Sequence, residues 1–262
     1  MQTVMALTHF PPGLLPLIAS FLGTDSILVV GGVDRYSTVM ATSFCHSIST
    51  NSWRTDMPSM QTARWGPASV AIGGRMMIFG GTDPHDQILA SCESFDPTTN
   101  EWSALPPMST PRACAFAAVW QDCAFVFGGY SDGVGPLSSA ERFDPMLNRW
   151  FHIAPMLNKR WNAAAVAVPD RGIIVMGTTL ISADLYDPAT NQWTTMSWQL
   201  PKPLRSFAAH CIDGVLHIIG GFNYRDGVTS ECWSMNLKAA VPVWVPFSSL
   251  PFPIHSVASV SV

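Results

Sequence analysis

The feature that most constrains this chain is a unit of about 49 residues that occurs five times in succession. An apolar run ends at a glycine in each copy, and these glycines are Gly31, Gly80, Gly128, Gly177 and Gly220. A tryptophan follows each glycine, at Trp53, Trp102, Trp150, Trp193 and Trp244, and the first three follow at the same offset of 22 residues. Such regular spacing indicates one supersecondary unit that is copied along the chain.

Each unit predicts four short strands, which are clearest between Arg112 and Trp150. A small, apolar run over 115–120 predicts the first strand, and a two-residue turn leads to a second strand over 123–127. The third strand is expected over 139–143, and a turn rich in Asp, Pro and Asn leads to a fourth strand with Trp150. We therefore predict an all-β propeller of four-stranded antiparallel blades, with each tryptophan packed between neighbouring blades.

The short sequence motifs that recur from unit to unit resemble those of kelch-repeat β-propellers. The shared features are the double glycine, an aromatic-Asp-Pro sequence, an Asn-x-Trp sequence and a Pro-x-Met…Arg connection. The aromatic-Asp-Pro copies are Phe95-Asp96-Pro97, Phe143-Asp144-Pro145 and Tyr186-Asp187-Pro188. The resemblance implies a kelch propeller over residues 26–262, preceded by an N-terminal segment, 1–25. A fold of this kind does not by itself identify a partner.

The N-terminal segment has two interpretations. The run from Phe10 to Leu22 overlays the first strand of the second unit when it is shifted by 49 residues, so it could form one more strand. It also resembles the opening helix of an F-box, since Leu14, Leu15 and Ile18 lie at helical spacing. Pro16 opposes the helix, because proline breaks a helix beyond its first turn. The extra strand and the F-box-like remnant both stay open at this point.

The end of the chain suggests how the ring closes. Residues 255–262 match the opening of a first strand, but no second, third or fourth strand follows them. The first unit, conversely, lacks a clear first strand before Ile27. We predict that the C-terminal strand closes the first blade and completes a ring of five blades, because closure removes an exposed edge. A six-bladed or incomplete ring is the alternative.

Composition excludes several classes of function. The 262 residues are 48% hydrophobic and 12% charged, with a net charge of −4. No run of Lys or Arg occurs, which argues against a nucleic acid or a membrane surface as partner. No basic residue precedes Arg35, so a secretory signal is not expected and we predict a cytoplasmic protein. The six cysteines fit reduced, packed thiols.

Few residues suggest chemistry. Asp83-Pro84-His85-Asp86 offers metal ligands close in sequence, but we interpret it as a solvated turn because no partner cluster appears elsewhere. No C-x-x-C sequence or nucleophile elbow occurs, and the four tyrosines are too few to favour the copper site of some kelch-fold oxidases. We expect no catalytic residue, metal or cofactor.

The strongest candidate for a site is one mouth of the central channel. Antiparallel pairing places the start of the first strand and the end of the second strand at the same edge of a blade. The residues expected there are Arg64, Arg112, Arg160, Arg205 and His255, with Trp65 and Trp161 beside the arginines and Tyr130 and Tyr224 in the loops. We predict that these residues bind a partner. The arginines could instead hold the loops by bonding backbone carbonyls.

A ring of guanidinium groups would suit an acidic or carboxylate-bearing peptide. Kelch-like substrate adaptors of cullin-RING ubiquitin ligases use the matching position, so the resemblance implies a non-enzymatic protein-interaction module and a role in substrate recognition. It covers only the propeller half of those adaptors. Counterparts of their BTB and BACK domains are absent from the sequence, so coupling to a ligase stays open. The alternatives are an enzyme built on the mouth, such as an oxidase or a sugar-acting epimerase or lyase, and an actin-associated scaffold.

Overall fold

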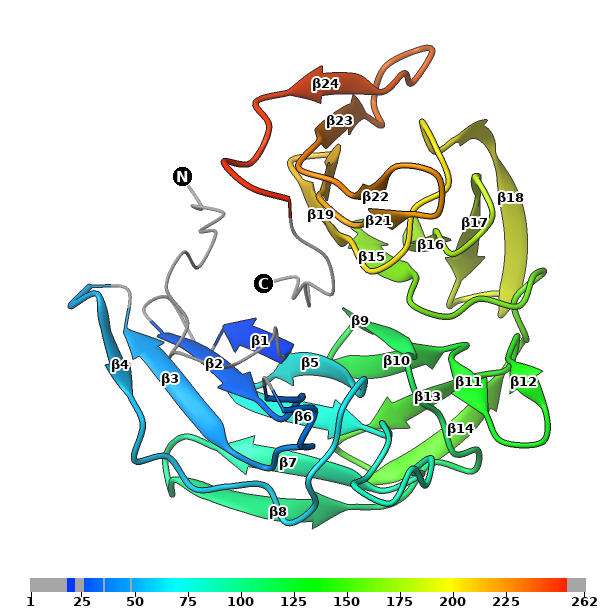
Figure 1. The fold of residues 1–262 in the computed structure, drawn as a ribbon. Coiled ribbons are helices and arrows are strands. Elements are labelled where there is room, and N and C mark those ends of the chain that lie inside the picture. Colours follow the sequence, from blue (N-terminus) through cyan, green and yellow to red (C-terminus); the bar gives the residue numbers. More distant parts are fainter. Residues whose placement is uncertain (1–17, 22–25, 35, 48, 254–262) are drawn as a thin grey trace.

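The computed structural model describes residues 18–21, 26–34, 36–47 and 49–253. Figure 1 shows five sheets set around a centre, with the first strand of each sheet inside and the fourth outside. Each sheet has four antiparallel strands, and no helix occurs among the described residues. The predicted five-bladed, all-β propeller is therefore confirmed. In this part of the chain, no helix is long and apolar enough to cross a membrane.

The blades follow one another along the chain. Blade one contains β1 (Ile18–Phe21), β2 (Ser26–Val30), β3 (Ser43–Ser47) and β4 (Ser52–Arg54). Blade two contains β5 (Ala68–Ile72), β6 (Arg75–Phe79), β7 (Cys92–Asp96) and β8 (Glu101–Leu105). Blade three contains β9 (Phe116–Trp120), β10 (Cys123–Phe127), β13 (Ala140–Asp144) and β14 (Arg149–Ile153). Blade four contains β15 (Ala164–Val168), β16 (Gly172–Met176), β17 (Ser182–Asp187) and β18 (Gln192–Gln199). Blade five contains β19 (Ala208–Ile212), β20 (Val215–Ile219), β23 (Cys232–Asn236) and β24 (Val245–Phe247).

Every blade has two edges with different connections. The loops between second and third strands lie at one edge, together with the connections that lead to the next blade, and we call this the loop edge. Two short ribbons extend it, β11 (Tyr130–Ser131) with β12 (Gly135–Pro136) and β21 (Phe222–Asn223) with β22 (Gly227–Val228). The short turns between first and second strands, and between third and fourth strands, lie at the opposite edge, which we call the turn edge.

The core lies between the blades, where inner strands of successive blades are neighbours, β1 with β5, β5 with β9, β9 with β15 and β15 with β19. The fourth-strand tryptophans of blades two to five attach each of these blades to the one before it, as predicted. The indole nitrogen of Trp102 donates to the carbonyl of Pro58 at 3.0 Å, and that of Trp150 donates to the carbonyl of Pro106 at 2.8 Å. The Trp150 ring also lies edge-on to Phe79 of blade two, 5.2 Å away. Burial of such rings stabilises the contact between blades.

The double glycines are required by the close approach of blades at the loop edge. Gly128 has a φ of +55°, and a Cβ at this position would collide with the carbonyl oxygen of Arg160 in the next connection. Gly80 has a φ of +65° and faces the carbonyl of Arg112 in the same way. Only glycine combines this backbone conformation with the absence of a side chain.

The prediction that the C-terminal strand closes blade one is wrong. Strand β1 occupies the inner edge of β2, where Ile18 pairs with Val30 and Phe21 pairs with Ile27. The N-terminal segment therefore supplies the first strand itself, because its small and apolar residues match the pattern of an inner strand. The propeller includes Ile18–Phe21, so the predicted boundary at residue 26 divides blade one. Of the two interpretations, the strand holds for 18–21, whereas residues 1–17 and 254–262 lie outside the described residues.

Candidate functional site

Three of the predicted partner-binding arginines are buried, which corrects the expectation that they line an open mouth. The side chains of Arg64, Arg112 and Arg160 are 0% exposed. In Arg112, Nη1 donates to the carbonyls of Gly128 and Ser139 at 2.9 Å each, and Nη2 donates to Glu141 at 2.9 Å. The guanidinium turns inward beneath the loop because carbonyl and carboxylate acceptors surround it there. These arginines hold the loops, as the architectural alternative stated.

The carboxylate partners belong to third strands, and two of them, Glu93 and Glu141, also accept from the backbone of the connection that follows the preceding blade. Glu141 accepts hydrogen bonds from the backbone and hydroxyl of Ser109 and from the backbone of Thr110, as well as from Arg112. Burial raises the pKa of Glu141, but these hydrogen bonds outweigh it and the net shift is downward. Arg64 with Glu93 and Arg160 with Asp184 form equivalent pairs at 2.6 and 2.7 Å. Each pair ties two blades together.

The sequence contains a signal for these pairs that the pattern of arginines alone did not reveal. An acidic residue lies two positions before the aromatic residue of each aromatic-Asp-Pro turn, at Glu93, Glu141 and Asp184. The register places Trp233 at this position in blade five and Phe44 in blade one. Acidic residues that recur with the arginines on third strands, each of which lies between two other strands of its sheet, indicate ion pairs inside the fold.

Arg205 is not the fourth member of that set. The carbonyl of each paired arginine accepts a hydrogen bond from the loop of the preceding blade, and in blade five the corresponding acceptor is Leu204. Arg205 lies one position later and pairs with Phe222, as Trp65 pairs with Thr82 and Ala113 with Tyr130. Leu204 and Trp233 thus replace the buried pair with apolar side chains, and Arg205 points to the loop edge.

Arg205 lies among aromatic rings. Its guanidinium carbon is 4.4 Å from the ring centre of Tyr224, 4.6 Å from that of Phe222 and 5.3 Å from that of Trp161. Its Nη1 donates to the phenol oxygen of Tyr224 at 2.7 Å. Stacking and this hydrogen bond orient the guanidinium. The side chain of Arg205 therefore loses less conformational entropy when a ligand binds.

The structure brings the predicted aromatic residues to the same edge. Trp65 is 37% exposed, Tyr130 is 44% exposed and Tyr224 is 59% exposed. Phe222 belongs to this group but was not predicted, because its role depends on the contact with Arg205 across the β21–β22 loop. We call the set of Trp65, Tyr130, Trp161, Arg205, Phe222 and Tyr224 the aromatic rim. His255, the last predicted member, lies outside the described residues.

Residues considered for other chemistry have structural roles. One carboxylate oxygen of Asp83 accepts hydrogen bonds from the backbone of His85 and Gln87, so this acidic sequence forms a turn. Within the described ranges, no group of three or more His, Cys, Asp or Glu side chains could hold a metal ion. All six cysteines are free thiols. Burial raises the pKa of Cys92 to about 12 and that of Cys114 to about 11, so neither forms a thiolate readily.

Comparison with known proteins agrees with this geometry. Residues 18–221 match the family described as the KLHDC2/KLHL20/DRC7 Kelch-repeats domain. The match begins at the first residue of β1, which supports the N-terminal segment as part of blade one.

Individual relatives have longer chains. Kelch-like protein 35 of Mus musculus is 32% identical over 189 residues, which cover 71% of this chain and 32% of the relative. The F-box/kelch-repeat protein At1g74510 of Arabidopsis thaliana is 35% identical over 91 residues, which cover 35% of this chain and 19% of the relative. The Influenza virus NS1A-binding protein homolog of Mus musculus is 40% identical over 57 residues, which cover 22% of this chain and 9% of the relative. The chain thus spans a third or less of the length of these relatives, and it belongs to the kelch-repeat family.

Proposed function

We propose that this propeller is a non-enzymatic protein-interaction module whose aromatic rim binds a protein or peptide partner. The observation that carries the proposal is the cluster of Arg205 with Trp161, Phe222 and Tyr224 at the loop edge. Partly exposed Trp, Tyr and Arg side chains on an ordered scaffold are the residue types that contribute most to protein interfaces. Membership of the kelch-repeat family supports an interaction role for the domain.

The partner that suits the rim pairs an apolar side chain with a carboxylate. Arg205 is the charged member of the aromatic rim, and Nη1 is the guanidinium nitrogen that donates to Tyr224. Further donors on the same guanidinium suit a carboxylate. The buried arginines do not contribute, because Glu93, Glu141 and Asp184 already accept their hydrogen bonds. The acidic character of the partner therefore depends on one arginine rather than on a ring of four.

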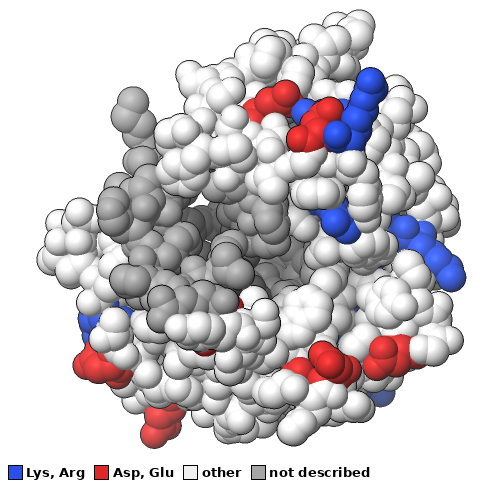
Figure 2. All heavy atoms as spheres, in the orientation of Figure 1, with Lys and Arg blue, Asp and Glu red and all other residues white. Residues whose placement is uncertain are grey.

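A second part of the proposal concerns the cellular role. Substrate recognition for a cullin-RING ubiquitin ligase is supported by the likeness to a kelch-like protein and to an F-box/kelch-repeat protein. A cytoplasmic location belongs to the same proposal. The surface seen in Figure 2 carries few charged side chains, scattered rather than gathered into one basic patch. This distribution supports a protein partner over nucleic acid or an anionic membrane.

Affinity capture with quantitative mass spectrometry tests the proposal. The test protein carries Arg205→Ala and Tyr224→Ala, which remove the guanidinium and the exposed ring together. Arg54→Ala is the matched control, because it removes an arginine that is 59% exposed, pairs with Asp56 and lies on the outer strand of blade one, outside the aromatic rim. We expect the rim variant to lose the captured partners and the control to keep them, with equal melting temperatures. Equal capture by all three proteins would contradict the proposal.

A further inference from the structure

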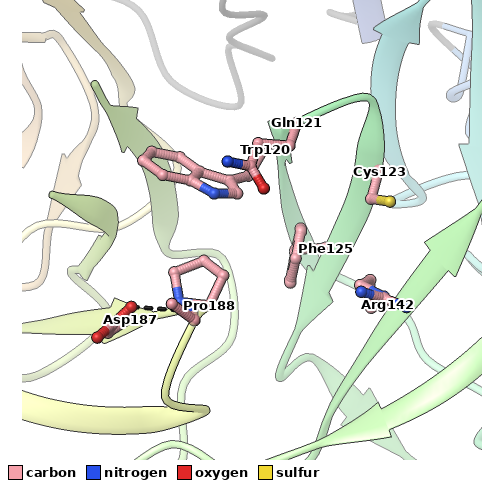
Figure 3. Close-up of a pocket in the computed structure, with 8 residues that line it drawn as sticks. Trp120, Gln121, Cys123, Phe125, Arg142, Asp187 and Pro188 are labelled. Carbon is pink, nitrogen blue, oxygen red and sulfur yellow. Dashed lines mark hydrogen bonds between the residues drawn. The ribbon is translucent and has the colours of Figure 1, made fainter. Parts of the chain in front are cut away.

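The turn edge carries a second surface feature, a cleft between blades three and four. It has a volume of about 180 Å³ and is lined by Trp120, Cys123, Phe125, Arg142, Asp187 and Pro188 among others. Figure 3 shows Trp120 and Gln121 facing Asp187 and Pro188 across the opening, with Phe125 and Arg142 to one side. The lining comes from the β9–β10 and β17–β18 turns and from β10 and β13, so the cleft lies opposite the aromatic rim.

Two lining residues depart from the repeat. Trp120 closes the hairpin of the first two strands, and the residues at this position in blades two, four and five are Ile72, Val168 and Ile212. Arg142 pairs with Phe125 on the second strand, and its counterparts are Ser94, Leu185 and Ser234. Blades of the same architecture thus form without a tryptophan or an arginine at these positions. Blade three alone among these four combines a large ring with a guanidinium at this edge.

Arg142 retains hydrogen-bonding capacity. Its Nε is buried and has no hydrogen-bond partner within the described part of the chain. Its closest ion pair is with Asp144 at 3.9 Å, and Asp144 itself accepts hydrogen bonds from the backbone of Met146 and Leu147. The guanidinium of Arg149 lies on the same Phe151 ring, 5.4 Å from its centre, where that of Arg142 lies at 4.8 Å. The other carboxylate of the cleft, Asp187, is likewise occupied, because it accepts from the backbone of Ala189 and from the hydroxyl of Thr190. Two cations whose neighbouring carboxylates are engaged in their own turns favour an additional anionic acceptor.

An exposed apolar turn adjoins this part of blade three. The β13–β14 turn presents Met146, which is 94% exposed, and Leu147, which is 64% exposed. Blade two has Thr98 and Thr99 in the corresponding turn, and blade four has Ala189 and Thr190. The same blade therefore carries an apolar turn, an aromatic cleft wall and an incompletely paired arginine at one edge. Apolar side chains grouped in this way are typical of a docking surface.

We propose that the turn edge of blade three is a second docking surface, which binds a protein segment that presents an aromatic side chain next to a carboxylate. The aromatic ring enters the cleft beside Trp120 and Phe125, the carboxylate accepts from Arg142, and Met146 with Leu147 covers the flanking residues. The inference is independent of the proposed function, because the aromatic rim lies at the other edge. A propeller that binds at both edges can hold two proteins together.

Titration with short peptides, followed by ¹H–¹⁵N NMR, tests this surface. The probe is N-acetyl-Phe-Glu-amide, and the matched control probe N-acetyl-Phe-Gln-amide lacks the carboxylate. Trp120→Ile and Arg142→Ser introduce residues that other blades carry at these positions. The signals that disappear from the spectra of these variants identify the Trp120 indole N–H and the Arg142 Nε–H. We expect both signals to shift saturably with a Kd of about 1 mM, as for a single side-chain anchor. The Gln probe should bind roughly threefold to tenfold more weakly, because it lacks the charge-assisted hydrogen bond.

Several outcomes would overturn the proposal. Absence of a saturable shift in the wild-type protein would do so, and this result does not depend on whether the variants fold. Equal binding of the two probes would remove the role of Arg142, as would undiminished binding to Arg142→Ser. Sedimentation velocity provides the remaining test: a wild-type dimer that Met146→Thr with Leu147→Thr converts to monomer would show that a second copy occupies the surface.

Discussion

Replacement of Arg112 by Met should destabilise the fold strongly, although Arg112 was first expected to bind a partner. The substitution leaves Glu141, whose side chain is 1% exposed, without its cation and removes the Arg112 donor from the carbonyl of Gly128, whereas the carbonyl of Ser139 keeps the backbone N–H of Gly128. Loss of one partner of a buried ion pair costs about 3–5 kcal/mol, because the remaining charge stays out of water. We therefore expect the free energy of unfolding to fall by about that amount.

The structure provides the matched double variant. Blade five carries Leu204 and Trp233 in place of the arginine and the acid, so Arg112→Leu with Glu141→Trp reproduces a combination that this fold accommodates. The loss of stability in the double variant should be smaller than the summed losses of Arg112→Leu and Glu141→Trp made separately. The difference should be about 0.5–3 kcal/mol, because the double variant leaves no charge unpaired. Incomplete fit of the indole in blade three reduces the gain.

Urea unfolding monitored by tryptophan fluorescence measures these differences from the transition midpoints. The pH dependence adds a second signature, since the lowered pKa of Glu141 stabilises the fold above its unfolded-state value, near 4.5. That contribution is lost as the pH falls through the lowered value, and Glu141→Gln should remove it. A loss below about 1 kcal/mol for Arg112→Met would refute the reasoning, because surface substitutions have effects of that size.

Three further predictions follow from the packing. Trp102→Ala and Trp150→Ala should each lower the free energy of unfolding by about 3–5 kcal/mol, since each indole is packed against the preceding blade and hydrogen-bonded to it; unchanged thermal unfolding would place these rings at the surface. Gly128→Ala should lower the free energy of unfolding by more than about 2 kcal/mol because its Cβ meets the Arg160 carbonyl, whereas Gly133→Ala, with a φ of +72° and open space around it, should lower it by about 1 kcal/mol. Equal losses for the two variants would count against the close approach of blades at Gly128. Cys92, which is 2% exposed and whose pKa is raised to about 12, should react with iodoacetamide at pH 8 only after unfolding, and rapid alkylation of Cys92 in the folded protein would contradict its burial.

The repeat in the sequence was sufficient to predict the blades. The expected strands of blade three differ from the observed strands β9, β10, β13 and β14 by one residue at most where both ends were predicted. This agreement has a physical origin: the glycines and the fourth-strand tryptophans meet a local requirement that recurs in every blade, and the Asp-Pro turns meet one that recurs in blades two, three and four. Closure of the ring was predicted wrongly, because both ends of the chain carry similar small, apolar residues and strand propensity does not distinguish between them.

The candidate site was harder to predict, since the start of a strand fixes the edge at which a residue lies but not the direction of its side chain. Arg112 and Arg205 both lie just before first strands, β9 and β19, yet one is buried against Glu141 and the other stacks on Tyr224. The two arginines occupy different positions of the repeat, because the fourth unit is shorter and Arg205 lies one residue after the position equivalent to Arg112. The backbone hydrogen bond to the carbonyl of Leu204 identifies Leu204 as the residue at that equivalent position. Partner identity depends on a second molecule and is not encoded in the repeat.

Hydrogen–deuterium exchange of the purified complex with its captured partner tests the central claim most directly, namely that the propeller binds through the aromatic rim at the loop edge. Protection should appear in the loops over 80–91, 128–139 and 220–231, and Arg205→Ala with Tyr224→Ala should abolish it while exchange in the strands stays unchanged. Protection confined to the outer strands β4, β8, β14, β18 and β24, with none in those loops, would contradict the claim.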